Sequence, residues 1–298
     1  MVATIGFFDG VHEGHKFLLR QLVSEAKRRG QSAVVITFEE HPRRVLRKDY
    51  IPELLTTNSE KERLLHQIGV DKVVFLEFTE DFRHLSAEEF MRTHLRDQYG
   101  ITTLLIGYDH HFGCNQHEGF EDYYRYGQAL GIEVILCEGH TVDSVKVSST
   151  HIRRTIMKGD ISAANQCLGY EYLLSGTVVE GHKIGRSIGF PTANIEVGNA
   201  CKLIPPCGVY AAWIEIDGTT HSCVLNIGRR PTINNGENIS IEAHVFNYSD
   251  LLYGKHVVLR FVAHLRDEIR FPSLEALQQQ IQLDAEMARC ILFDSRKQ

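Results

Sequence analysis

The chain has 298 residues, of which 43% are hydrophobic and 23% charged, and its formal net charge is −6. This length allows two domains of ordinary size, and the composition is typical of a soluble globular protein. The negative charge argues against a nucleic-acid-binding protein that relies on a large basic surface. No apolar run is long enough to cross a membrane, and the first residues lack the regions of a secretory signal. The seven cysteines form no CxxC pair, which is typical of reduced thiols, so we expect a cytoplasmic protein.

Strand-like and helix-like patterns alternate in the first half of the chain. The apolar, β-rich runs lie at 2–7, 32–38, 71–78, 102–109 and 132–139. A helix is predicted over 16–29, with an apolar face formed by Leu18, Leu19, Leu22, Val23 and Ala26. Nearly continuous apolar strands that alternate with helices predict an α/β domain, a parallel sheet with helices on both faces.

Helix boundaries are also visible in this half. Ser59 with Glu62, and Ser86 with Glu89, have the spacing of capping boxes, which predicts that helices begin there. Gly100 follows the second of these helices and is expected to end it.

The second half consists mainly of consecutive strands. Its strand-like runs lie at 172–181, 208–216, 219–228, 239–248 and 255–265. Asp217-Gly218 predicts a two-residue hairpin, and short turns between the strands predict a small antiparallel β-barrel. A closing helix is predicted from about Ser273, and the residues expected to dock it on the barrel are Leu274, Leu277, Ile281, Ala288 and Ile291. We therefore expect two domains, 1–168 and 169–298.

The stretch GFFDGVHEGH, residues 6–15, lies between the first strand and the first helix. A glycine-rich turn at the N-terminus of a helix is suited to binding phosphate. The spacing is neither that of a Walker P-loop nor that of the HExxH zinc motif. His12 and His15 can donate hydrogen bonds to phosphate oxygens there. The alternative is a pair of solvated histidines in a turn.

This stretch resembles the HxGH signature of nucleotidylyltransferases, in which two histidines stabilise charge on the phosphates without a covalent intermediate. The resemblance implies catalytic roles for His12 and His15. A second signature of that family is matched by KVSSTHIRRTI, residues 146–156, although serine and threonine at a helix start are also common for structural reasons. The residues that the resemblance assigns to ATP and its phosphates are Gly6, Phe8, Asp9, Gly10, Gly14, Lys146, Ser149, Thr150 and Arg153.

A third segment, GYDHHFGCNQHEGF at 107–120, directly follows a predicted strand. Its histidines and Cys114 could be interpreted as a zinc site, but their spacing fits no common pattern. The segment resembles the GxDxxFG loop of bacterial FAD synthetases, which implies that Asp109, Phe112 and Gly113 lie beside flavin and nucleotide.

The run GTVVEGHKIGRSIGFPTANIEV, residues 176–197, contains the full GxxxGRxxGFPTAN signature of riboflavin kinases. With HxGH upstream, the whole chain resembles the bifunctional bacterial riboflavin kinase/FAD synthetase family. Thr192 and Asn194 supply hard oxygen ligands that suit Mg²⁺ carrying ATP phosphates. The resemblance places the remaining signature residues at the ATP and flavin site of the kinase: Gly181, Gly185, Arg186, Gly189 and Pro191.

A phosphoryl transfer to a hydroxyl needs a base. In the strand predicted at 239–248, alternation places Ser240, Glu242 and His244 on the face opposite Ile239, Ile241 and Ala243. The resemblance assigns the base to Glu242, whereas an isolated glutamate on a strand is usually only solvated. The segment 224–232 also matches the family and is expected to pack near the flavin.

These observations predict a bifunctional, ATP- and Mg²⁺-dependent transferase that makes FMN from riboflavin and then FAD from FMN. Riboflavin, FMN, FAD and ATP are then substrates or products, and we expect no nucleic acid, membrane or obligate protein partner. Phe7, Glu40 and His110 depart from the family pattern near the first site. The alternatives are an enzyme whose first domain is inactive, and a flavin-binding regulator without turnover.

Overall fold

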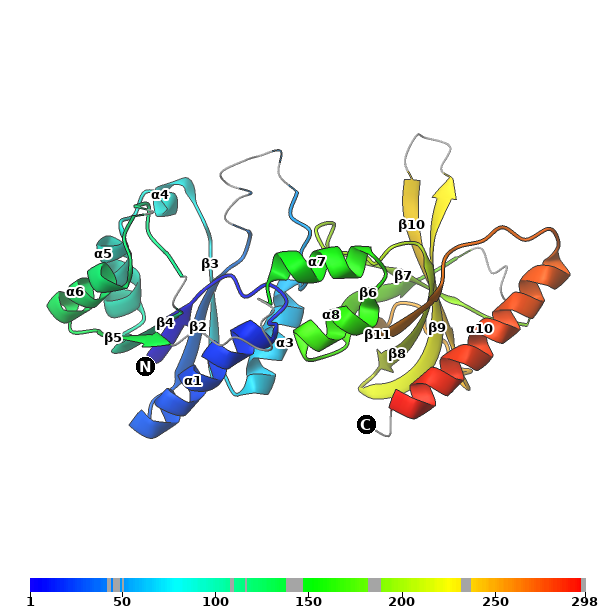
Figure 1. Cartoon of the computed structure of the whole chain (residues 1–298), viewed down its shortest axis with the longest axis horizontal. Coiled ribbons are helices and arrows are strands. Elements are labelled where there is room, and N and C mark those ends of the chain that lie inside the picture. The colour runs from blue at the N-terminus through cyan, green and yellow to red at the C-terminus, as the bar shows by residue number, and fades with distance from the viewer. Residues whose placement is uncertain are drawn as a thin grey trace. The chain divides into compact units, whose positions relative to one another are not determined.

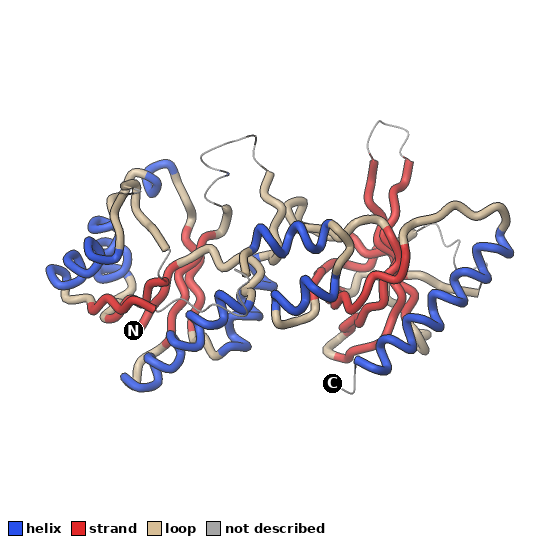
Figure 2. Tube along the Cα trace, viewed as in Figure 1, coloured by secondary structure: helices blue, strands red, loops and turns tan. Residues whose placement is uncertain are grey.

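A computed structural model describes residues 1–41, 44, 49, 51–107, 110–115, 117–137, 147–181, 189–231 and 237–295, without the side chains of 230, 231, 237 and 238. The chain forms two compact units, Met1–Ser149 and Thr150–Gln298. Strands alternate with helices in the first unit, whereas the second consists mainly of strands (Figure 2). Within the part of the chain that the structure describes, no helix has the length and apolar character needed to cross a membrane.

The first unit contains a five-stranded parallel sheet, as predicted. Its strands are β1 (Val2–Ile5), β2 (Ala33–Phe38), β3 (Lys72–Leu76), β4 (Thr103–Gly107) and β5 (Glu133–Cys137), and their order is β3-β2-β1-β4-β5. The strand order reverses direction at β1. In sheets of this kind, ligands bind outside the carboxyl ends of the strands at such a switch point, here the ends of β1 and β4.

Helices pack on both faces of this sheet (Figure 1). They are α1 (Glu13–Arg29), α3 (Asn58–Ile68), α4 (Glu80–Arg83), α5 (Ala87–Phe90), a π-helical continuation η1 (Met91–Gln98), and α6 (Phe120–Leu130). The predicted face of α1 is confirmed except at Leu18, which is only half-buried. Its buried side chains attach α1 to the sheet, and this fixes the place of the turn that precedes it.

The helix boundaries are partly as predicted. Ser86 and Glu89 form a capping box, and Gly100 follows η1 in the left-handed conformation, at φ +60°. The box predicted at Ser59 is wrong, because Thr57 caps α3 and Glu60 completes the box. The sequence contains two overlapping S/T-x-x-E spacings, one starting at Thr57 and one at Ser59. Asp9 binds the backbone just before Thr57, and this favours the earlier of the two.

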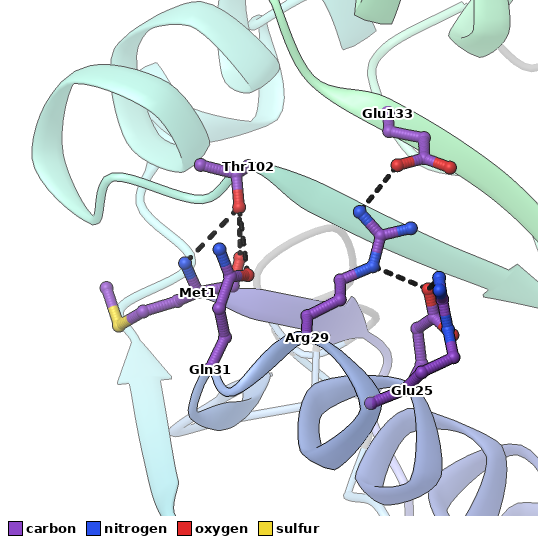
Figure 3. A network of polar contacts seen from close by, with 7 residues as sticks. Met1, Glu25, Arg29, Gln31, Thr102 and Glu133 are labelled. Carbon is purple, nitrogen blue, oxygen red and sulfur yellow. Dashed lines mark hydrogen bonds and ion pairs between the residues drawn. The ribbon is translucent and has the colours of Figure 1, made fainter.

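A polar network joins the amino-terminal edge of the sheet to the end of α1 (Figure 3). Arg29 lies between Glu25 and Glu133, with N–O distances of 2.5 and 2.6 Å. Thr102 donates to the Gln31 side chain and to the carbonyl of Met1. These contacts hold together the starts of β1, β4 and β5, at the edge opposite the ligand-binding end.

The second unit is a closed barrel with strand order β10-β7-β6-β11-β8-β9. Its strands are β6 (Tyr172–Val179), β7 (Ala193–Glu196), β8 (Gly208–Ile216), β9 (Thr219–Pro231), β10 (Glu237–Val245) and β11 (His256–Arg266). The predicted hairpin is confirmed, since Asp217 and Gly218 have φ of +49° and +78°. Strand β7 was not predicted, because its four residues lie inside a motif interpreted as a turn.

The described helices in the rest of the chain are α7 (Ser149–Met157), α8 (Ile161–Leu168) and α10 (Leu274–Ser295), and of these α8 and α10 contact strands of the barrel. Ala285, Ala288 and Leu292 of α10 are buried against the barrel. The prediction that Leu274 docks is wrong, because 61% of its surface is exposed. Leu274 is the first residue of the helix and precedes the stretch that packs on the strands.

Candidate active sites

The turn between β1 and α1 has an unusual backbone. Phe8, Gly10 and Val11 have positive φ values of +50°, +82° and +38°. Such conformations strain residues that carry a side chain, above all β-branched valine, and they persist where surrounding contacts enforce them. Strained turns of this kind are concentrated at functional sites.

Asp9 supplies those contacts. Its buried carboxylate accepts hydrogen bonds from the amides of Leu55 and Thr56 at 2.9 and 3.0 Å and from the Thr56 hydroxyl at 3.3 Å. Ser149 Oγ donates to the carbonyl of Asp9 at 2.9 Å. Asp9 thus shapes the turn from within, and Ser149, the first residue of α7, contacts it.

The two signature histidines stack on each other. Their ring centroids are 3.6 Å apart and their planes are inclined by 16°. His12 is the N-cap of α1, and its Nδ1 accepts from the His15 amide at 3.3 Å. This bond makes Nδ1 an acceptor, so in a neutral His12 the proton lies on Nε2.

His15 is held neutral. Burial lowers its pKa well below the usual value, and charge repulsion from His12 and Lys61 adds to the effect. Its Nδ1 is buried and has no hydrogen-bond partner among the described residues. The edge of the Phe8 ring packs against it, with centroids 5.3 Å apart. A neutral, oriented imidazole at a helix N-terminus can donate a hydrogen bond to a phosphate oxygen.

Two signature glycines lie in close contact with aromatic side chains of the site. A Cβ on Gly14 would lie 3.2 Å from Cε1 of His12, and one on Gly6 would lie 2.9 Å from the Phe8 ring. Side chains at these positions would displace the rings. Gly6 and Gly14 therefore keep the aromatic groups of the site in place.

The other residues predicted for the first site lie on two segments. Thr150 is exposed on α7 and Arg153 follows one turn later, whereas Lys146 lies outside the described residues. Phe112 stacks on Tyr123 at 4.2 Å, and a Cβ on Gly113 would lie 2.6 Å from the Ala87 amide. This loop is therefore anchored on α5 and α6. Asp109 lies outside the described residues as well.

The described part of the 107–120 loop gives no support to a zinc site. No group of three or more metal-binding side chains occurs among the described residues. His111 instead contacts the carbonyl of Glu118 through Nδ1 at 2.9 Å.

The barrel brings together the polar residues of the second signature. Thr192 Oγ1 donates to Glu242 Oε2 at 3.3 Å. Glu242 pairs with Asn194 on β7 and with Asn226 on β9. The Thr192 hydroxyl thus contacts the Glu242 carboxylate, and Asn194 lies opposite Glu242 on the neighbouring strand, although both residues are about 50 positions away from it in the sequence.

Backbone contacts hold this cluster in position. His244 Nδ1 contacts the Pro191 carbonyl at 2.9 Å, which fixes the turn before β7. A Cβ on Gly181 would clash with the side-chain amide of Asn194, so any larger residue there would displace that amide. Gly189 has φ +84°. Gly185 and Arg186 lie outside the described residues.

A cavity of about 330 Å³ opens beside Thr192 and Glu242. Apart from these two, its lining residues are Phe190, Val209, Val224, Leu225, Asn226, His244, Arg266, Glu268, Ile269, Phe271, Leu277, Ile281 and Asp284. Val224 to Asn226 belong to a segment expected near the flavin. Sequence reasoning missed the contribution of residues 266–284, because their apolar spacing indicated only the docking of a helix.

The fold and the two sites define a two-domain transferase. One domain presents a strained, glycine-rich turn at the switch point of a parallel sheet, and the other presents Thr192 and Glu242 beside a largely apolar cavity. Residues 1–151 match the family model for FAD synthetase, and residues 168–292 match that for riboflavin kinase.

Comparisons with individual proteins identify the family. A bifunctional riboflavin kinase/FMN adenylyltransferase from Listeria monocytogenes is 35% identical over 97% of this chain and 91% of its own length. A second one, from Pseudomonas fluorescens, is 35% identical over 99% of this chain and 94% of its own length. The chain belongs to the bifunctional riboflavin kinase/FMN adenylyltransferase family, which confirms the resemblance seen in the sequence.

A solved structure shares the fold of the whole chain. The Streptococcus pneumoniae protein described as a macrolide-efflux protein matches with a TM-score of 0.88 and 31% identity, over 97% of this chain and 93% of its own. That description differs from the names of the two sequence relatives, which agree with both family models.

Proposed function

We propose that this chain phosphorylates riboflavin with ATP in the barrel and then adenylylates FMN with a second ATP in the first domain. The observation that carries the proposal is the presence of both clusters in one chain: two stacked histidines at a helix N-terminus, and Thr192 and Asn194 beside Glu242. The first suits charge stabilisation on phosphates, and the second suits metal-assisted transfer to a hydroxyl.

In the first domain, a phosphate oxygen of FMN attacks the α-phosphorus of ATP. A new P–O bond forms, the bond to the β-phosphate breaks, and pyrophosphate leaves with the electron pair. His12 and His15 donate hydrogen bonds to the oxygens on which charge develops. Catalysis of this kind depends on positioning and electrostatic stabilisation. The turn residues Gly6, Phe8, Asp9, Gly10 and Gly14 shape the phosphate site.

The remaining residues of this domain bind the substrates. Ser149, Thr150 and Arg153 contact the triphosphate, with Lys146 as a further cation, and the loop with Asp109, Phe112 and Gly113 borders the flavin. The support for these roles is the family match of residues 1–151 together with the contact between Ser149 and the turn.

In the barrel, Glu242 takes the proton from the ribityl 5′-hydroxyl as that oxygen attacks the γ-phosphorus of ATP, and ADP leaves. The hydroxyl of Thr192 and the amide oxygen of Asn194 fit Mg²⁺, because both are hard ligands and both lie beside Glu242. Bound Mg²⁺ would neutralise phosphate charge. Gly181, Gly185, Arg186, Gly189 and Pro191 form the loop over the phosphates, and the cavity with Phe190 and Phe271 takes the flavin ring.

Measuring the two half-reactions separately tests the proposal. Purified protein is incubated with riboflavin, ATP and magnesium, and FMN and FAD are separated over time. His15→Ala should lower FMN adenylylation by about 10²–10³-fold and leave riboflavin phosphorylation intact. Glu242→Gln should lower phosphorylation by about 10²–10⁴-fold and leave adenylylation intact.

The matched control for the glutamate is Glu196→Gln, because Glu196 is exposed on the neighbouring strand β7. Equal loss of both half-reactions in one variant would show that the sites are not independent. Flavin binding without turnover would support a regulator instead, and FMN without FAD would show an inactive first domain.

The functional boundary is proposed at residue 168, since the kinase family model begins there and β6 begins at Tyr172. The substrates are riboflavin, FMN and ATP, without an obligate protein partner. Cytoplasmic location follows from the supply of ATP and from the pattern of free cysteines.

A further inference from the structure

Lys61 is a buried cation beside the first site. It lies in the first turns of α3, and only 1% of its surface is exposed. Its Nζ is 4.2 Å from the centroid of the Phe7 ring and 5.7 Å from that of Phe75. Its one hydrogen bond within the described residues goes to Thr37 Oγ1 at 3.4 Å. An aromatic face and one long hydrogen bond therefore replace the water around this ammonium group.

Lys61 is connected to the catalytic turn by contacts and by charge. Thr37, which accepts from Lys61, donates to the carbonyl of Phe7 at 3.2 Å. The titratable groups that interact with the ammonium through their charge are Asp9 on the turn and His15 in the first turn of α1. Thr37 on β2 and Phe75 on β3, which also lie against it, are uncharged. Any change at Lys61 is therefore felt at Phe7, Asp9 and His15.

Stability alone does not account for this lysine. Burial lowers its pKa to about 8, and the negative charge of Asp9 only partly offsets that effect. A buried cation without a full set of hydrogen bonds destabilises a fold relative to an apolar side chain of similar size. Retaining the cation directly behind a strained phosphate-binding turn indicates a role in that turn.

We propose that Lys61 is a positioning residue of the adenylyltransferase site. In its charged form it acts through its contacts with Phe7 and Thr37 and through its electrostatic effect on His15. This inference rests on the proposed function of the first domain. The ammonium, covered by the Phe7 ring, holds the start of the turn, and its charge adds to the burial that keeps the His15 imidazole neutral. Phe7, a departure from the family pattern, thereby gains a function in this chain as the cover of Lys61.

The test compares Lys61→Met with Lys27→Met, since Lys27 is an exposed lysine of α1. Lys61→Met should lower kcat for FMN adenylylation on the order of 10–100-fold, with KM for ATP and riboflavin phosphorylation unchanged. Its Tm should be equal to or above that of the unchanged chain. Loss of both FMN adenylylation and riboflavin phosphorylation would indicate a structural role and overturn the proposal. So would a lowered Tm accompanied by a proportional loss of FMN adenylylation.

The pH profile adds a readout that a structural role would not move. In the unchanged chain, kcat/KM for adenylylation should fall above about pH 8 as Lys61 loses its proton. Lys61→Met should abolish this alkaline limb. Phe7→Leu removes the cation–π contact, which favours the charged form, so the limb should move to lower pH. An unmoved limb in Phe7→Leu refutes the proposal even where Lys61→Met fails to fold.

A third measurement does not depend on turnover. Removing the positive charge of Lys61 should raise the pKa of His15. This pKa is measured by NMR of protein with labelled histidine, and the His15 signal is assigned by its absence in His15→Ala. A chain that shows this shift but makes no FAD would contradict the proposed function and overturn the catalytic part of the inference, while the effect of Lys61 on His15 would stand. An unshifted His15 in a folded Lys61→Met variant would overturn the role itself.

Discussion

Removing the carboxylate of Asp284 should destabilise the barrel domain strongly. Asp284 on α10 is buried, and it accepts from Arg266 through Nε at 3.0 and 3.1 Å and through Nη2 at 2.7 Å. Gln280 donates to it at 2.9 Å. In Asp284→Ala the guanidinium stays half-buried and loses its counterion, and breaking such a pair costs about 3–5 kcal/mol. For a unit of this size that corresponds to a Tm lower by roughly 6–20 °C.

The assay is scanning calorimetry of the full chain together with riboflavin phosphorylation, since Arg266 and Asp284 line the cavity. The control is Lys255→Ala, which breaks the contact between Lys255 and Asp217 on the surface of the same domain. An exposed pair of this kind contributes about 0–1 kcal/mol. If Asp284→Ala shifted Tm no more than Lys255→Ala, the buried pair would not stabilise the docking of α10. Replacing both partners by apolar residues should restore much of the loss, because no unpaired charge remains.

Three further predictions follow from close contacts and from burial. Gly181→Ala should lower riboflavin phosphorylation about 10–100-fold by displacing Asn194, with FMN adenylylation unaffected; full kinase activity would contradict this. In iodoacetamide labelling at pH 8 followed by mass spectrometry, exposed Cys114 should react well before Cys137, whose thiol is buried and has its pKa raised to about 11. The pKa of Lys61 falls from 10.5 to about 8 on folding, so the unfolded chain binds more protons between these values. Stability of the first domain measured by denaturant titration should therefore rise with pH across that window, and a fall attributable to Lys61 would contradict its burial as a cation.

Local patterns in the sequence were sufficient to predict most of the fold. Apolar runs in the first half and hairpin signals in the second gave the parallel sheet and the antiparallel barrel. Strand β7 was not predicted, because in the sequence a four-residue strand after Pro191 resembles the end of a turn. The cap of α3 was misplaced because its choice depends on Asp9, about 50 residues away in the sequence. Both errors occur where a distant contact decides a local structure.

The same distinction applies to the sites. His12, His15, Thr192 and Glu242 could be found in the sequence because they belong to segments that resemble family motifs. The surroundings of these residues come from elsewhere in the chain. Lys61 lies in the polar run NSEKER, where it looks like any solvated lysine of a helix surface, and only its burial against Phe7 shows otherwise.

This difference has a consequence for how the first site works. Its strained turn is built on Asp9 and covers Lys61, so the geometry of the motif depends on residues that the motif does not contain. A short peptide or a grafted loop with the sequence GFFDGVHEGH would lack the amides of Leu55 and Thr56 and the ammonium behind Phe7. Positive φ values at Phe8 and Val11 would then relax, because nothing would offset their strain. The geometry of the turn is for this reason a property of the whole first domain.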